Sequence, residues 1–142
     1  MRTGLLCSIV LGCLGVASSL AAQQCPAGRP PAGDLGIRAV RCTGPAASCA
    51  INVRTGGDDS VRHEFAVEPV ITTVADETDL HVGDALVALD GLLITTAAGG
   101  ERLAGLRAGA SVQILVRRDG VLHEIRMTAG RGCGIGSLRV SR

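Results

Sequence analysis

The chain has 142 residues, and its first 22 are typical of a removable leader, which leaves about 120 residues for one domain of ordinary size. All 14 basic residues are arginines and balance 13 acidic residues, while the chain has one Phe and no Tyr or Trp. A near-neutral chain without stacking aromatics lacks the features of a nucleic-acid binder, and one small domain leaves no room for a two-domain enzyme.

The N-terminal segment, residues 1–22, has the features of a secretory signal peptide. Arg2 precedes an apolar run over residues 4–16, and small residues follow that run. Gly and Ser residues interrupt the run, which favours cleavage over retention as a membrane anchor. A lipid anchor at Cys13 or Cys25 is the weaker alternative, because neither cysteine has the residue order of a lipidation site. We expect an exported protein, periplasmic or extracellular, with no stable membrane span after cleavage.

Export determines how the remaining cysteines are interpreted. Four cysteines outlast the leader, and in an oxidising compartment they predict disulfides. Cys42 and Cys49 enclose a short turn-forming loop and suit a local bridge, in which case Cys25 and Cys133 would tie the two ends of the domain together. A zinc site is the competing interpretation, but no Cys-x-x-Cys spacing exists, so we expect no metal and no other cofactor.

The N-terminal half of the mature chain predicts a lead-in and three strands. Residues 23–33 are rich in Pro and Gly and form a flexible lead-in. Alternating apolar residues predict strands over 35–42, 49–54 and 61–67. The last two strands flank a turn at 55–60 and therefore form a hairpin.

Residues 69–94 predict three more strands. A β-branched run over 69–74 predicts a central strand, and the polar segment 75–80 has room for one helical turn. A strand over 85–89 meets a short strand over 92–94 at the tight turn Asp90-Gly91.

The C-terminal part predicts a helix, a hairpin and a tail. A helix over 97–106 begins after a capping threonine, Thr95 or Thr96. Strands over 111–117 and 121–127 flank a second Asp-Gly turn, and the tail, residues 130–142, is Gly-rich with a short strand near its end. The whole is mainly β with one or two short helices, as in a small, partly open β-barrel or a sandwich.

Three segments in this order resemble a bacterial PDZ domain. They are Val70 to Val74, the element Leu80-His-Val-Gly-Asp-Ala-Leu-Val-Ala-Leu-Asp-Gly91, and Val112 to Gly120. The resemblance covers residues 34–129, so it implies a PDZ-like domain between the lead-in and the tail. We expect Asp84 and Asp90 within the second element to accept backbone hydrogen bonds at turns, with no catalytic role.

The resemblance implies a peptide-binding site. Such domains hold a peptide's terminal carboxylate on a Gly-Φ-Gly-Φ loop, and the peptide adds to the sheet beside a helix. The segment Asp34-Leu35-Gly36-Ile37 resembles this loop, although Asp34 replaces the first Gly and its charge could repel a carboxylate unless Arg38 or Arg41 offsets it. The expected peptide-binding residues are Leu35, Gly36, Ile37, Arg38, Leu103 and Leu106.

Two departures from the family pattern accompany this site. The small-residue helix that usually precedes the Gly-Asp element is replaced by the short acidic segment 75–80. The segment 42–67 is long, with its own cysteine-bracketed turn and hairpin, and could extend or obstruct one end of the groove.

No arrangement of residues points to catalysis. Ser111 and Ser137 lack a Gly-x-Ser-x-Gly setting, and His63, His81 and His123 are scattered, so we expect each histidine at the surface or at a strand edge. The sequence therefore predicts a non-catalytic module that binds the C-terminus or an extended part of a protein by strand addition. The alternative is a structural or interaction module whose groove is filled by its own tail, residues 132–142, as an accessory subunit of an envelope complex or a protease.

Overall fold

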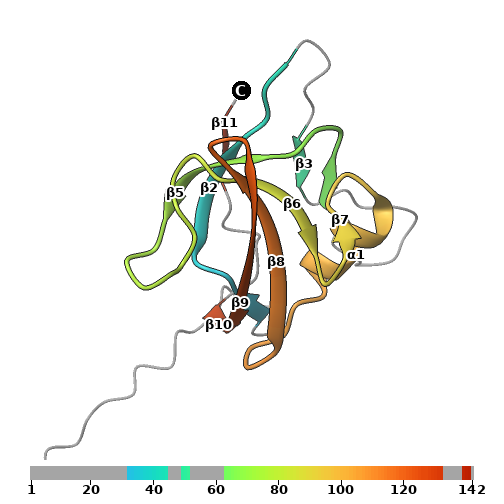
Figure 1. The fold of residues 1–142 in the computed structure, drawn as a ribbon. Helices are drawn as coiled ribbons and strands as arrows, with labels where there is room; N and C mark the ends of the chain where they lie inside the picture. The colour runs from blue at the N-terminus through green and yellow to red at the C-terminus, as the bar shows by residue number, and fades with distance from the viewer. Residues whose placement is uncertain (1–31, 45–48, 52–62, 133–138, 142) are drawn as a thin grey trace, which may run out of the picture.

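A computed structural model describes residues 32–44, 49–51, 63–132 and 139–141. This part of the chain is mainly β with one short helix, which confirms the predicted fold class (Figure 1). The elements are β1 (Ala32–Asp34), β2 (Ile37–Arg41), β3 (Cys49–Ile51), β4 (His63–Phe65), β5 (Val70–Val74), β6 (Ala85–Leu89), β7 (Leu92–Leu93), α1 (Ala97–Ala104), β8 (Ser111–Arg118), β9 (Val121–Thr128), β10 (Gly130–Gly132) and β11 (Arg139–Ser141).

The described strands form one large sheet and two small ones. The large sheet has the order β11-β2-β5-β6-β8-β9, with β7 also paired to β6. All its pairings are antiparallel except the one between β11 and β2, which is parallel. β1 pairs with β10, and β3 pairs with β4, in two separate antiparallel ribbons. These sheets do not close into a barrel among the described residues.

The two Asp-Gly turns form as predicted. Asp90 and Gly91 both have positive φ, at 47° and 79°, and Asp119 and Gly120 have φ of 50° and 80°. Two consecutive positive φ values define the type I′ turn, whose twist matches that of the flanking strands. The second turn joins β8 and β9, the two longest strands of the sheet.

The helix α1 begins where the sequence predicted it. Thr96 caps it, since its Oγ1 accepts a hydrogen bond of 3.2 Å from the Gly99 amide. The helix ends at Ala104, two residues before the predicted end, and Leu106 lies beyond it. Gly99, Gly100 and Leu103 form its buried side.

One expected element does not form. The sequence left room for one helical turn over residues 75–80, but no turn of helix forms there, since this segment consists of bends. The Thr78 hydroxyl accepts a hydrogen bond from the Leu80 amide at 3.3 Å, so a side chain supplies locally the partner that a helix would have supplied.

Two short strands lie in segments expected to be irregular. β1 includes Ala32 and Gly33 from the expected lead-in, and β10 lies in the Gly-rich tail. Gly33 is buried there, so an added Cβ would lie 2.8 Å from the Arg107 carbonyl oxygen. The leader, Cys25, the turn at 55–60 and Cys133 lie outside the described residues.

One hydrophobic core joins the large sheet to α1. It consists of aliphatic side chains from most of the strands and the helix, with a single aromatic ring from β4. Its buried members are Leu35, Val40, Phe65, Ile71, Leu80, Leu86, Leu89, Ile94, Leu103, Leu106, Val112, Ile114, Val116 and Ala129. No helix in the described part of the chain is long and apolar enough to cross a membrane.

Candidate functional site

The loop that resembles a carboxylate-binding loop already holds a carboxylate of its own chain. Gly36 has a φ of 77°, which favours glycine, and its amide donates a hydrogen bond of 2.8 Å to Oδ1 of Asp34. The same oxygen lies 2.8 Å from Nη1 of Arg38. Partial burial acts to raise the pKa of Asp34, but the hydrogen bonds from Arg38 and Gly36 outweigh it and hold the pKa below its ordinary value. Asp34 is therefore ionised at neutral pH and occupies the Gly36 amide.

The backbone of this loop is anchored on the connection between β5 and β6. The Gly36 carbonyl accepts a hydrogen bond of 2.7 Å from the Ala75 amide, and the Leu35 carbonyl accepts one of 3.3 Å from the Thr78 hydroxyl. A Cβ at Gly36 would lie 3.0 Å from Cβ of Thr78. The Leu35 side chain is buried in the core, and Ile37 packs against it. The loop is thus held from both its backbone and its side chains.

The outer edge of β2, where a peptide would add, is paired with the chain's own β11. Arg139, Val140 and Ser141 pair with Ala39, Val40 and Arg41 in parallel orientation. Because the strands are parallel, β11 runs away from the Asp34–Ile37 loop. No described strand pairs with Ile37 or Arg38 on this side.

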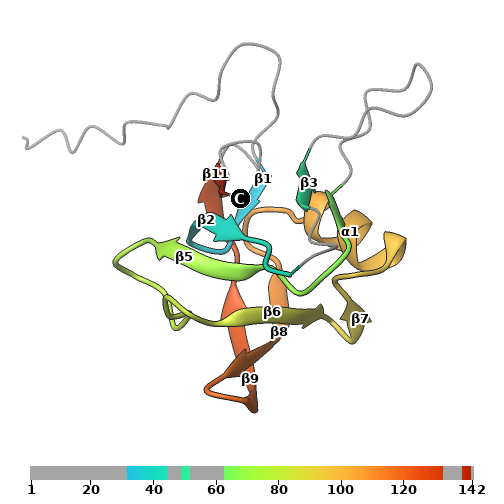
Figure 2. The same ribbon diagram turned by 90° about the horizontal axis from the view of Figure 1, so that it is seen from above.

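The helix α1 does not face β2. The ribbon of β3 and β4 lies between them (Figure 2). The contact between α1 and β4 is close, since a Cβ on Gly100 would lie 1.8 Å from the carbonyl oxygen of His63. β4 therefore occupies the side of the helix where the sequence led us to expect a groove.

The expected binding residues divide into two groups. Leu35, Leu103 and Leu106 come together, but as buried members of one core, each no more than 3% exposed. Arg38 is exposed and binds Asp34. The three leucines thus lie together, but their side chains are buried and offer no surface to a peptide. Arg38 pairs with Asp34 of the same chain.

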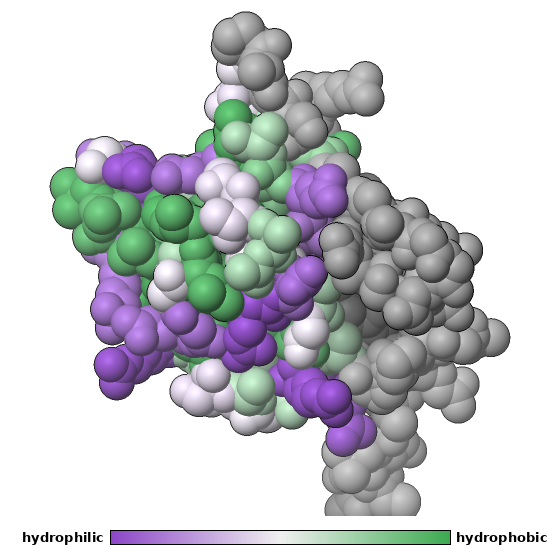
Figure 3. All heavy atoms as spheres, turned by 90° about the vertical axis from the view of Figure 1, so that its right-hand side faces the viewer, coloured by the Kyte–Doolittle hydropathy of each residue, from purple (hydrophilic) through white to green (hydrophobic). Residues whose placement is uncertain are grey.

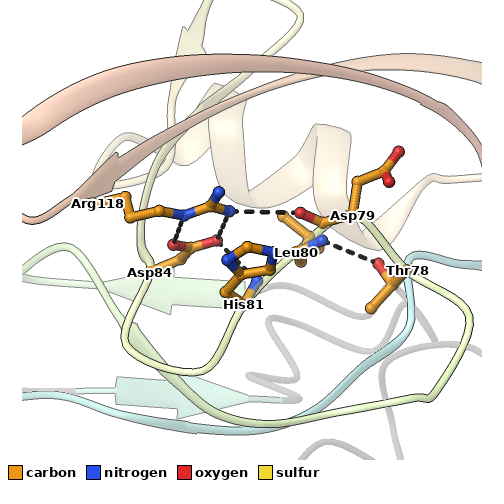
Figure 4. A network of polar contacts seen from close by, with 6 residues as sticks. All are labelled: Thr78, Asp79, Leu80, His81, Asp84 and Arg118. Carbon is orange, nitrogen blue, oxygen red and sulfur yellow. Dashed lines mark hydrogen bonds and ion pairs between the residues drawn. The ribbon is translucent and has the colours of Figure 1, made fainter.

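A second polar network holds the turn before β6 against the end of β8 (Figure 4). Nε and Nη2 of Arg118 lie 2.7 and 2.8 Å from the two carboxylate oxygens of Asp84, and Nη2 also donates to the Asp79 carbonyl at 3.3 Å. Asp84 further accepts a hydrogen bond of 2.8 Å from the His81 amide, as its turn role predicted. Burial acts to raise the pKa of Asp84, but its bonds to Arg118 and His81 keep the pKa below the ordinary value.

Asp90 has a similar arrangement at the surface. Its Oδ1 accepts a hydrogen bond of 2.8 Å from the Gln113 amide, and its Oδ2 lies 2.7 Å from Nη2 of Arg102. The hydrogen bond from Gln113 is the main cause that lowers the pKa of Asp90. Asp84 and Asp90 thus both brace turns, and each also pairs with an arginine that sequence reasoning missed.

His63 corrects an expectation from the sequence. His81 and His123 are exposed as predicted, but His63 is only 2% exposed. Its ring stacks on Phe65 with centroids 6.4 Å apart, and its Nδ1 has no hydrogen-bond partner among the described residues. Burial lowers its pKa to about 4, so the ring is neutral at neutral pH. The alternation that places His63 and Phe65 on one strand face is the signal that could have predicted this burial.

The disulfide between Cys42 and Cys49 forms as predicted, with Cα atoms 5.8 Å apart. It ties the end of β2 to the start of β3 and so positions the ribbon that packs on α1. The cysteines proposed for the second bridge, Cys25 and Cys133, lie outside the described residues. Within the described ranges, no three His, Cys, Asp or Glu side chains cluster closely enough to hold a metal ion.

No protein-family model and no curated protein sequence matches this chain. The functional assignment therefore rests on the geometry of the Asp34–Ile37 loop, the β2 edge and the helix.

Proposed function

We propose that this protein is an exported, non-catalytic interaction module of PDZ-like design whose peptide slot is occupied by its own chain. The observation that carries the proposal is the pairing of β11 with the outer edge of β2. A strand that already has two neighbours offers no free backbone groups to an incoming peptide over the paired residues. In this proposal, β11 of the tail takes the position at the β2 edge that a bound peptide would take.

The rest of the slot supports the same proposal. The carboxylate of Asp34 takes the loop amide of Gly36, where the family pattern would seat a peptide's terminal carboxylate. β4 covers the side of α1 that would otherwise face a ligand. β11, the Asp34 carboxylate and β4 thus take the places of a peptide's strand, its terminal carboxylate and its contact with the helix.

Export is the part of the proposal that the leader and the disulfide support. The Cys42–Cys49 bridge is compatible with an oxidising compartment, where such bonds persist. In the periplasm or outside the cell, a small module of this kind would serve as an accessory subunit that joins other proteins.

A second candidate is peptide binding by strand exchange. Over the described residues, the β11–β2 pairing spans three residues and is parallel, a pairing that is slightly less stable per residue than an antiparallel one. An extended segment that also pairs with Ile37 and Arg38 would make more backbone hydrogen bonds than β11 does. Because Asp34 holds the loop amide, this segment would be internal or amidated rather than a free chain end.

The test is a peptide titration of the oxidised, leader-free protein, read by fluorescence anisotropy. Extended peptides are supplied as free acids and as amides, and the intact protein is compared with a variant that lacks residues 139–142. Binding only by the shortened protein supports the self-occupied slot. Equal binding by both proteins supports strand exchange. If neither protein binds, the β2 edge is not a peptide-binding site.

The Asp34→Gly variant distinguishes the contribution of the Asp34–Ile37 loop to peptide binding from that of the β2 edge. Removal of the carboxylate frees the Gly36 amide, so free-acid peptides should gain affinity relative to their amides in the shortened protein. Asp76→Gly is the matched control, because Asp76 is exposed and lies outside the loop. An unchanged preference in Asp34→Gly would contradict the role given to Asp34.

A further inference from the structure

The strand β9 presents a long unpaired edge. It is the end strand of the large sheet, and β8 is its only partner among the described strands. Its eight residues, Val121–Thr128, make it far longer than β11 at the other end of the sheet. A long regular edge is a ready template for pairing with another strand unless some feature blocks it. β9 has no proline, and its register with β8 runs without a bulge.

The turn at Asp119-Gly120 determines which residues of β9 offer backbone groups at this edge. A two-residue type I′ turn closes on a hydrogen-bonded pair, here Arg118 with Val121. Hydrogen-bonded and non-hydrogen-bonded pairs alternate from that point. The residues whose N–H and C=O groups point away from β8 are therefore Leu122, Glu124, Arg126 and Thr128.

These outward residues are self-complementary in charge. A two-fold axis at Ile125 places Glu124 of one copy opposite Arg126 of the other, twice. The same register pairs Leu122 with Thr128, so all four outward residues are used and about eight backbone hydrogen bonds form. A shift of the axis to Glu124 sets two glutamates opposite each other, and a shift to Arg126 sets two arginines opposite each other, which is unfavourable.

The two charges lack a strong partner within their own copy. On β8, Glu124 lies opposite Leu115, and Arg126 lies opposite Gln113, so neither faces an opposite charge across the strands. Within β9 the two side chains approach only to 3.6 Å and are 51% and 78% exposed, respectively. This ion pair is long and exposed, so it contributes little, and each side chain can exchange it for a partner across an interface.

Apolar side chains next to this edge would gain cover from a second copy. Val121 is 58% exposed and Leu122 is 51% exposed, while Ile125 and Met127 pack on the core but remain partly accessible. Figure 3 shows apolar residues gathered on the left-hand part of the molecule, the side on which β8 and β9 lie. In the register centred on Ile125, the two Ile125 side chains face each other and Met127 lies opposite His123.

We propose that two copies of this protein associate through antiparallel pairing of β9 with β9, about a two-fold axis at Ile125. The contact continues the large sheet from one copy into the other. It uses an edge remote in sheet order from β2 and β11, so it does not depend on the proposed slot.

Charge reversal tests the proposal by sedimentation of the oxidised, leader-free protein, from low micromolar to near-millimolar concentration. The wild type should be a dimer at the upper end of this range. Glu124→Arg and Arg126→Glu each replace two cross-copy attractions with repulsions, so each should raise the dimer Kd about tenfold or more. Glu64→Arg is the matched control, since Glu64 is exposed on β4, and it should leave the Kd unchanged.

The decisive measurement mixes the two single variants. A copy with Arg at 124 and a copy with Glu at 126 are complementary at both contacts, so an equimolar mixture should dimerise although each variant alone does not. The double reversal, Glu124→Arg with Arg126→Glu, should also restore the dimer. A wild type that stays monomeric, or single variants that dimerise like the wild type, would overturn the proposal, and circular dichroism confirms that each variant is folded.

Discussion

Two regions of the molecule are held together in different ways. The hairpin region consists of two hairpins, β6–β7 and β8–β9, each joined by an Asp-Gly turn, and β6 pairs with β8. The edge region, consisting of β2, β3, β4 and β11, joins segments from distant parts of the chain, such as Arg139 with Ala39. The first region is organised by local turn chemistry, and the second by one disulfide, one helix contact and the chain's own tail. The difference indicates that the two regions respond to different perturbations.

The contact between β4 of the edge region and α1, the helix that connects the two hairpins, should be the most sensitive to substitution. In Gly100→Ala the new Cβ would lie 1.8 Å from the His63 carbonyl oxygen, so β4 must separate from α1. We expect a loss of more than about 3 kcal/mol in the free energy of unfolding, despite the better helix propensity of Ala. Urea denaturation measures this loss.

Gly105→Ala is the control at the end of the same helix. Its Cβ would have its nearest contact at 3.2 Å, from the Glu101 carbonyl oxygen, so the change should stay within about 1 kcal/mol. Equal effects of the two substitutions would contradict a close β4–α1 contact.

The hairpin region should depend most on its buried carboxylate. Asp84→Ala removes both hydrogen bonds to Arg118 and the bond from the His81 amide, at a position that is 1% exposed. We expect a loss of about 3 kcal/mol, measured by urea denaturation at neutral pH. Asp90→Ala, which breaks the exposed counterpart, should cost about 1 kcal/mol, and the reverse order would refute the importance given to burial.

The edge region should respond to reduction of its disulfide. Cys42 and Cys49 are separated by 7 positions, and a cross-link over so short a loop contributes about 2.5 kcal/mol by limiting the unfolded chain. The double variant Cys42→Ala with Cys49→Ala should lower the free energy of unfolding by this amount. Amide hydrogen exchange in this variant should be faster than in the wild type in β3 and β4, with little change in β8 and β9. An equal increase in the exchange rate in both regions would show that the two regions do not respond separately.

Acidification should act on the edge region through His63. Its folded pKa of about 4 lies below the ordinary value of 6.5, so the unfolded chain takes up the proton first. The free energy of unfolding should therefore fall as the pH drops from about 6.5 to about 4, by on the order of 3 kcal/mol, and this contribution should be constant outside that window. Asp34 and Asp84, whose pKa values are lowered from 3.8, act at lower pH.

Substitutions of single histidines test whether His63 causes this loss of stability at acidic pH. His63→Leu should flatten the pH dependence between about 6.5 and 4, because no group titrates at that position. His123→Gln, at an exposed site, should leave the pH dependence as it is in the wild type. A slope that persists in His63→Leu would place the responsible group elsewhere.

Sequence patterns were sufficient to predict the features that arise between near neighbours. Alternation predicted the strands, and consecutive Asp and Gly predicted the two tight turns. A capping threonine, Thr95 or Thr96, predicted the helix start, and Thr96 is the cap that forms. The spacing of Cys42 and Cys49 predicted their bridge. Each of these depends on a few adjacent residues, so their chemistry alone is sufficient.

Which distant segments lie together depends on long-range packing, and no local pattern predicted it. It put β11 on β2, β4 against α1, and Leu103 and Leu106 in the core instead of along a groove. It also buried His63. These outcomes depend on competition among all apolar surfaces and strand edges of the folded chain, and sequence periodicity does not reveal which partner covers which edge.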